Sequence, residues 1–254
     1  MGISADGQAI KKSLIFNTNK DFDEQIEKIR TEGEILLDGQ KPVQVSGGIA
    51  GIWNKDKSKL YKSPHLPDYD NKPIKKKLEK IFDCGVTLGN DVEMEGLGEA
   101  NFGAGRRKSP VVMLSVGTGV GGVKIDNGTV SQNEFGFEPG HMILDVDGGI
   151  GYFEDFVSGS AMERIYGRKP QNIDDPEVWN RETQLLAIGI HNLIVLWSPQ
   201  IVILAGGVMN KIDPEKLKSL ISVQMKVFPN LPEIKLGELG DKAGLYGSLI
   251  ACNR

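Results

Sequence analysis

Residues 111–122 read VVMLSVGTGVGG, which predicts a buried β-strand followed by a glycine-rich turn. The turn, Gly117 to Gly122, formally satisfies the G-x-G-x-x-G pattern of dinucleotide-binding proteins. That pattern needs a helix after the glycines, whereas a second strand, Val123 to Ile125, and a turn at Asp126-Asn127-Gly128 follow here. The sequence therefore predicts a β-hairpin and excludes a Rossmann-type site. A glycine turn can still present backbone N–H groups to a phosphate, and a plain flexible turn is equally well supported.

The segment that precedes this strand is the best candidate for a domain boundary. Residues Gly103 to Pro110 are rich in Gly, Arg and Lys and end in Pro. We therefore expect an N-terminal lobe of residues 1–109 and a C-terminal lobe of residues 110–254.

Both lobes show the alternation of strands and helices that is typical of an α/β fold. Before the boundary we expect a hairpin around Asp6-Gly7 between Gly2 to Ala5 and Ser13 to Asn17, a helix over Asp21 to Arg30, and strands over Pro42 to Gly48 and Gly85 to Gly89. The ends of the last two strands should face one cleft. After the boundary we expect helices over Glu177 to Trp197, Pro214 to Phe228 and Ala243 to Ala251, and a strand over Ile201 to Leu204.

The composition excludes several classes of protein. A net charge of -4 gives no basic footprint for nucleic acid, so we expect no nucleic-acid partner. The first residues lack the apolar stretch of a signal peptide, and no apolar run is long enough to span a membrane. Cys84 and Cys252 are too far apart in sequence for a zinc motif or a disulfide framework. We expect a soluble, cytoplasmic protein with no membrane partner, and we assign no metal-ligating residues.

A polar pair, Asn90-Asp91, lies where a predicted strand meets a predicted helix. Asn and Asp are common helix N-caps because their side chains accept hydrogen bonds from the first-turn N–H groups. The alternative is that Asp91 points into the cleft and accepts the proton of a substrate hydroxyl, as an Asp base does in phosphoryl transfer to an alcohol.

A second group of polar residues follows the glycine turn. Glu138-Pro139-Gly140-His141, with Glu154 downstream, brings two carboxylates and an imidazole into a glycine-rich stretch, and such groups can bind vicinal sugar hydroxyls. Further on, Ala205-Gly206-Gly207-Val208 follows a strand, where the glycines can pack against a nucleotide or simply form a tight turn. His65 and His191 are taken as structural by default.

In this order the motifs resemble the ROK family (repressor, open reading frame, kinase) of sugar kinases and sugar-responsive repressors, over nearly the whole chain. The resemblance implies the actin-like ATPase (ribonuclease H-like) fold, with two lobes around a cleft, and ATP with Mg²⁺ as cofactors. It implies Asp91 as the catalytic base, and the sugar ligands Asn90, Glu138, His141 and Glu154. For ATP it implies Gly117, Thr118, Gly119 and Gly121 in a second phosphate loop, and Gly206 and Gly207 in an adenosine motif.

The sequence departs from the family pattern at three places. Residues 143–153 contain no cysteine, although many members have a zinc-binding cluster there, so we expect no zinc. Ala50-Gly51 replaces the usual Pro-Gly, and His65 replaces an Asn before Leu-Pro, so sugar preference can differ and His65 is a further candidate ligand. Members begin with a strand ending in Asp-x-Gly-Gly-Thr, the first phosphate loop, whereas Met1 to Gly7 already resembles their second strand. A late start codon and a truncated gene are both open explanations.

The resemblance predicts an ATP-dependent hexose kinase, with glucose as the default substrate and activity impaired by the missing loop. A homodimer is left open. The first alternative is a degenerate, non-catalytic sugar-binding protein. The second is a sugar-responsive transcriptional regulator, disfavoured because no helix-turn-helix segment precedes the first lobe.

Overall fold

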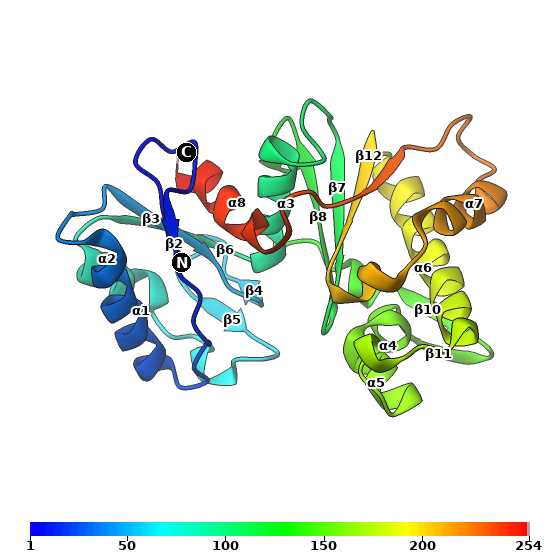
Figure 1. Cartoon of the computed structure of the whole chain (residues 1–254), viewed down its shortest axis with the longest axis horizontal. Helices are drawn as coiled ribbons and strands as arrows, with labels where there is room; N and C mark the ends of the chain where they lie inside the picture. The colour runs from blue at the N-terminus through cyan, green and yellow to red at the C-terminus, as the bar shows by residue number, and fades with distance from the viewer. Residues whose placement is uncertain (253–254) are drawn as a thin grey trace. The chain divides into compact units, whose positions relative to one another are not determined.

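The computed structural model describes residues 1–252, which form two compact units (Figure 1). Unit 1 comprises residues 1–102, residues 132–136 and the C-terminal segment from Asp241, and unit 2 comprises residues 103–131 and 137–240. This division differs from the expected lobes of 1–109 and 110–254, because the last helix and a short internal segment pack with unit 1. No helix among residues 1–252 is both long enough and apolar enough to cross a membrane.

The strands of unit 1 pair two by two. β1 (Gly2–Ile3) and β2 (Lys12–Ser13) form the predicted antiparallel hairpin, although its paired part is shorter than expected. β3 (Gln44–Gly48) and β6 (Gly85–Gly89) are parallel, with Gly48 opposite Gly89, so their carboxyl ends lie at the same edge. A third pair, β4 (Ile52–Trp53) and β5 (Leu60–Lys62), is antiparallel.

The helices of unit 1 enclose a core that includes Phe22, Trp53, Leu60 and Leu78. The helical segments are α1 (Phe22–Leu37), η1 (Pro67–Tyr69), α2 (Ile74–Phe82), α3 (Asp91–Phe102) and α8 (Ala243–Cys252), with η5 (Gly240–Lys242) leading into α8. The helix predicted from Asp21 to Arg30 continues to Leu37, because its last turn also buries an apolar side chain, Leu36.

Helices α3 and α8 are in unusually close contact. A Cβ atom on Gly247 would lie 1.7 Å from the carbonyl oxygen of Met94, and one on Gly98 would lie 2.1 Å from that of Ala243. Side chains at these positions would prevent the approach, so glycine is required for this packing. The contact fixes α3, and with it the residues at the start of α3.

Unit 2 is built on one five-stranded sheet in the order β13-β12-β7-β8-β9. β7 (Val111–Val116) and β8 (Val120–Asp126) form the predicted hairpin, whose glycine turn is limited to residues 117–119. β12 (Ile201–Ala205) is parallel to β7 and to β13 (Glu233–Leu236), and β9 (Thr129–Val130) pairs with β8.

Helices of unit 2 cover this sheet, and the longest is α6 (Pro176–Trp197), close to its predicted range (Figure 1). Its residues Leu186, Ile190 and Leu193 are fully buried in the core, together with Val112 and Leu114 of β7. The other segments are η2 (Pro139–His141), β10 (Ile143–Val146), β11 (Gly149–Tyr152), α4 (Glu154–Val157), α5 (Gly159–Tyr166), η3 (Pro170–Asn172), η4 (Gly207–Lys211) and α7 (Pro214–Gln224).

Candidate functional site

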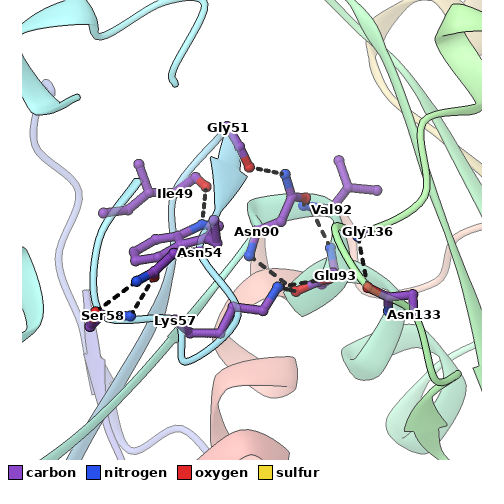
Figure 2. A network of polar contacts seen from close by, with 11 residues as sticks. Ile49, Gly51, Asn54, Lys57, Ser58, Asn90, Val92, Glu93, Asn133 and Gly136 are labelled. Atoms are coloured by element: carbon purple, nitrogen blue, oxygen red, sulfur yellow. Dashed lines mark hydrogen bonds and ion pairs between the residues drawn. The ribbon is translucent and has the colours of Figure 1, made fainter. Parts of the chain in front are cut away.

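In unit 1, Asn90 connects the end of β6 to the start of α3 and caps the helix (Figure 2). Its Oδ1 accepts hydrogen bonds from the N–H groups of Val92 at 2.8 Å and Glu93 at 3.3 Å. Its Nδ2 donates to the carbonyl oxygen of Gly51 at 3.2 Å. The predicted N-cap is therefore Asn90. Because Oδ1 already accepts two bonds, the amide has one N–H left to offer to a ligand.

Asp91 is the first residue of α3 and is partly buried. Burial raises the pKa of its carboxyl group above the usual aspartate range, and the neighbouring charge of Glu93 acts in the same direction. Backbone N–H groups at the start of the helix and the nearby His65 lower the same pKa, but less strongly. A carboxylate whose basicity is increased in this way is suited to accept a proton.

In unit 2, three of the predicted sugar ligands lie together. His141 Nδ1 is 3.3 Å from Glu138 Oε2, and His141 Nε2 is 3.8 Å from Glu154 Oε1. The imidazole ring also packs edge-on against Tyr152, with ring centres 4.9 Å apart. The imidazole and both carboxylates are partly exposed, so a ligand can reach them.

Glycine explains why the Glu-Pro-Gly-His segment lies where it does. A Cβ atom on Gly140 would lie 2.2 Å from the carbonyl oxygen of Val120, and one on Gly122 would lie 2.6 Å from Pro139 Cγ. The η2 turn therefore packs directly on β8 because both sides carry glycine. This contact sets the position of Glu138, which precedes the turn, and of His141, its last residue.

The glycine turn between β7 and β8 is held from two sides. The carbonyl oxygens of Gly117 and Thr118 accept hydrogen bonds from the N–H groups of Gly159 at 2.7 Å and Ser160 at 3.2 Å. On the other side, the N–H of Val120 donates to Glu154 Oε2 at 3.1 Å. The turn is therefore ordered, and one carboxylate connects it to the His141 cluster.

A second pair of glycines lies at the same edge of this sheet. Gly206 follows β12 with a φ of 92°, and a Cβ there would lie 2.3 Å from the carbonyl oxygen of Val116. Gly207 has open space around its Cα. Because β7 and β12 are parallel, Gly206 and Gly207 lie beside Gly117, at the carboxyl ends of the two strands. Gly121 differs from the others, since it pairs with Ser115 within the hairpin.

Several residues around these groups were not predicted from the sequence. Lys57 and Glu93 in unit 1 are 36 positions apart, and their pairing is visible only in the structure (Figure 2). Ser158 could have been found, because Ser before a helical pattern is a common N-cap, and its side chain accepts the N–H of Ala161 at 3.1 Å. Within residues 1–252, no group of three or more His, Cys, Asp or Glu side chains is arranged to hold a metal ion.

The family model described as the ROK family matches residues 3–254. The chain belongs to the ROK family. This ROK protein is 26% identical to a glucokinase of Thermotoga maritima, over 97% of this chain and 90% of that protein. It is 28% identical to an N-acetyl-D-glucosamine kinase of Yersinia pseudotuberculosis, over 79% of this chain and 77% of that protein.

A solved structure shares the fold of this ROK protein. The ROK family glucokinase from Streptomyces griseus, in complex with glucose and AMPPNP, superposes with a TM-score of 0.82 at 22% identity. The match covers 99% of this chain and 95% of the other. The chain therefore has the actin-like ATPase fold.

Proposed function

We propose that this ROK protein transfers the γ-phosphoryl group of ATP to a hydroxyl group of a hexose, with glucose as the first candidate substrate. The observation that carries the proposal is the cluster of Glu138, His141 and Glu154 in unit 2. The names of the relatives, glucokinase and N-acetyl-D-glucosamine kinase, support the same class of reaction.

Sugar recognition would use both hydrogen-bond acceptors and hydrogen-bond donors of the protein. The carboxylates of Glu138 and Glu154 accept hydrogen bonds from hydroxyl groups, and charge-assisted bonds of this kind are the stronger ones. His141 can donate or accept according to its tautomer. Asn90 offers a single Nδ2 N–H to a sugar oxygen, because its other polar positions are used within unit 1.

Asp91 would act as the general base. As the hydroxyl oxygen forms a bond to the γ-phosphorus and the bond from that phosphorus to the bridging oxygen breaks, the hydroxyl proton passes to the Asp91 carboxylate. ADP leaves with the electrons of the broken bond. The elevated pKa of Asp91 supports this role, because proton acceptance becomes more favourable as the basicity of the acceptor rises.

ATP, as its Mg²⁺ complex, would be the second substrate and bind to unit 2. In the turn that contains Gly117, Thr118 and Gly119, the Gly117 N–H is bonded to the carbonyl oxygen of Gly119, so Thr118 and Gly119 would offer their N–H groups to phosphate, with Gly121 behind them in β8. Gly206 and Gly207 leave a surface free of side chains on which the adenosine can lie. Both groups are at the carboxyl edge of the sheet, where ligands of α/β proteins usually bind.

The test is ATP-dependent phosphorylation of a panel of glucose, N-acetylglucosamine, mannose and N-acetylmannosamine, with sugar binding measured by calorimetry. Replacing Glu138 by Ala should weaken binding of the preferred sugar by about 1.5–3 kcal/mol, the contribution of a hydrogen bond to a charged group. The matched control is Glu163→Ala, an exposed carboxylate of α5, which should bind sugar normally. If both variants bound sugar equally well, the assignment of the cluster would be wrong.

A second candidate is a sugar-binding protein without catalytic activity. The same cluster of Glu138, His141 and Glu154 can bind a sugar whether or not phosphoryl transfer follows. Phosphoryl transfer depends on alignment of the γ-phosphate more strictly than sugar binding does. Sugar affinity by calorimetry with no turnover of any sugar in the panel would favour this candidate.

A further inference from the structure

In unit 1, an ion pair connects the β4–β5 turn to the first turn of α3. Lys57 Nζ lies 3.3 Å from both carboxylate oxygens of Glu93. The Glu93 side chain is only 10% exposed and that of Lys57 is 34% exposed. A carboxylate at this depth is costly without a partner, and the lysine ammonium compensates that cost. Gly136 lies beside the same carboxylate, since a Cβ there would be 3.9 Å from Glu93 Oε1.

The turn that carries Lys57 is itself well ordered (Figure 2). Asn54 Oδ1 accepts hydrogen bonds from the N–H groups of Ser58 at 2.9 Å and Lys59 at 3.0 Å. Lys57 adopts a left-handed backbone conformation with a φ of 52°, and its N–H donates to the carbonyl oxygen of Asn54 at 2.9 Å. The lysine therefore extends from a fixed point, unlike a side chain on a loose loop.

Glu93, held by Lys57, in turn holds Asn90. Its Oε2 accepts the backbone N–H of Asn90 at 3.2 Å, while Asn90 Nδ2 donates to Gly51, just before β4. These contacts form a closed network (Figure 2). Lys57 in the β4–β5 turn pairs with Glu93, Glu93 accepts the Asn90 N–H, and Asn90 donates to Gly51 at the beginning of the same hairpin. Asn90 is thus fixed through both its main chain and its side chain.

We propose that Lys57 and Glu93 are a positioning pair, which holds the one remaining Nδ2 N–H of Asn90 in the orientation that receives a hexose. The role of Asn90 as a sugar ligand rests on the function proposed above. The positioning itself is a property of the unliganded protein. It can therefore be measured separately from activity.

The experiment combines hydrogen exchange of the Asn90 backbone N–H, measured by NMR without sugar, with steady-state kinetics. Lys57→Ala should raise the exchange rate of the Asn90 backbone N–H and the KM for the hexose, each by about three- to tenfold, as expected when one ordinary hydrogen bond is weakened. The KM for ATP should not change. Lys57→Arg keeps the charge and should restore both values.

Two further variants make the test specific. Lys55→Ala is the matched control, because Lys55 pairs with Glu134 at 3.5 Å on the surface, with side chains 82% and 60% exposed, and neither readout should change. Glu93→Ala should be at least as severe as Lys57→Ala, because it also removes the acceptor of the Asn90 backbone N–H. The double variant should be no worse than Glu93→Ala, because Lys57 acts through Glu93.

Unchanged exchange at Asn90 in Lys57→Ala would overturn the proposal, and so would fully additive effects in the double variant. An increase in exchange with no change in hexose KM would also overturn it, because the pair would then only support the helix end. If the wild-type protein neither binds nor phosphorylates any sugar, the proposed function fails, and the exchange measurement still decides whether Lys57 and Glu93 position Asn90.

Discussion

At the scale of single residues, the start of α3 combines a helix cap with a partly buried carboxyl group. Asn90 satisfies the N–H groups that every helix leaves open at its first turn, and Asp91 comes next with a carboxyl group that is not needed for the cap. The sequence could only offer capping and catalysis as alternatives for the pair. In the structure Asn90 makes the capping hydrogen bonds, whereas burial dominates the environment of the Asp91 carboxyl group and the first-turn N–H groups affect it less.

Replacing Asp91 by Asn tests the proposed role of its carboxylate directly. The change keeps the size of the side chain and removes the proton acceptor, so kcat should fall by about 10²- to 10⁴-fold, the usual contribution of general-base catalysis. Sugar affinity should stay nearly constant, because Asn90 and the unit 2 cluster are unchanged. Calorimetry and a coupled kinetic assay measure the two quantities. If kcat stayed at the wild-type value, Asp91 would have no catalytic role.

At the scale of secondary-structure elements, strong local patterns predicted the structure well and weak ones did not. The ranges of β6 and β7 match the predicted strands because each is an apolar run with glycine at its end. The β4–β5 hairpin was not predicted, since its strands have two and three residues and are defined by pairing with each other. For the same reason Lys57, which lies in that hairpin, had no signal in the sequence.

The helix α6 contains a buried carboxyl group that the periodicity of the helix does not explain. The Glu182 side chain is fully buried, and Tyr166 donates its hydroxyl to Oε1 at 2.9 Å. Oε2 has no hydrogen-bond partner within the part of the chain that the structure describes. Burial raises the pKa of Glu182 to about 7, against the opposing effects of Tyr166 and Arg181.

The raised pKa of Glu182 predicts how stability depends on pH. Because the folded state holds the proton more tightly than the unfolded chain, this contribution is complete below the unfolded pKa of about 4.3 and is lost as pH rises through about 7. Glu182→Gln keeps the hydrogen bond from Tyr166 and cannot ionise. The difference in unfolding free energy between variant and wild type, from urea titrations, should grow between pH 5 and pH 8. A constant difference would contradict the prediction.

At the scale of the whole molecule, the two units are not consecutive stretches of the chain, because each is built from separate segments. Helix α8 lies at the end of the sequence and belongs to unit 1, where it packs against α3. Nothing in the sequence near Ala243 indicates that this helix belongs to unit 1, because its contact with α3 depends on Gly98 and Gly247, which are far apart in the chain. The boundary near Gly103 could be predicted from local composition, whereas the return of the chain to unit 1 could not.

The close contact between α3 and α8 predicts that one methyl group in α8 disturbs unit 1 selectively. A Cβ on Gly247 would overlap the carbonyl oxygen of Met94, so Gly247→Ala should force the helices apart and destabilise the protein by about 1–3 kcal/mol, a typical cost of overpacking. Gly244→Ala is the matched control in the same helix, because a Cβ there meets nothing within 4 Å, and better helix propensity should leave it equally or more stable. Hydrogen exchange of the native protein should show reduced protection in α3 and β3, with the strands β7 and β12 of unit 2 unchanged. Equal stability of the two variants, or an equal loss of protection in both units, would show that the glycine contact does not determine the packing of α3.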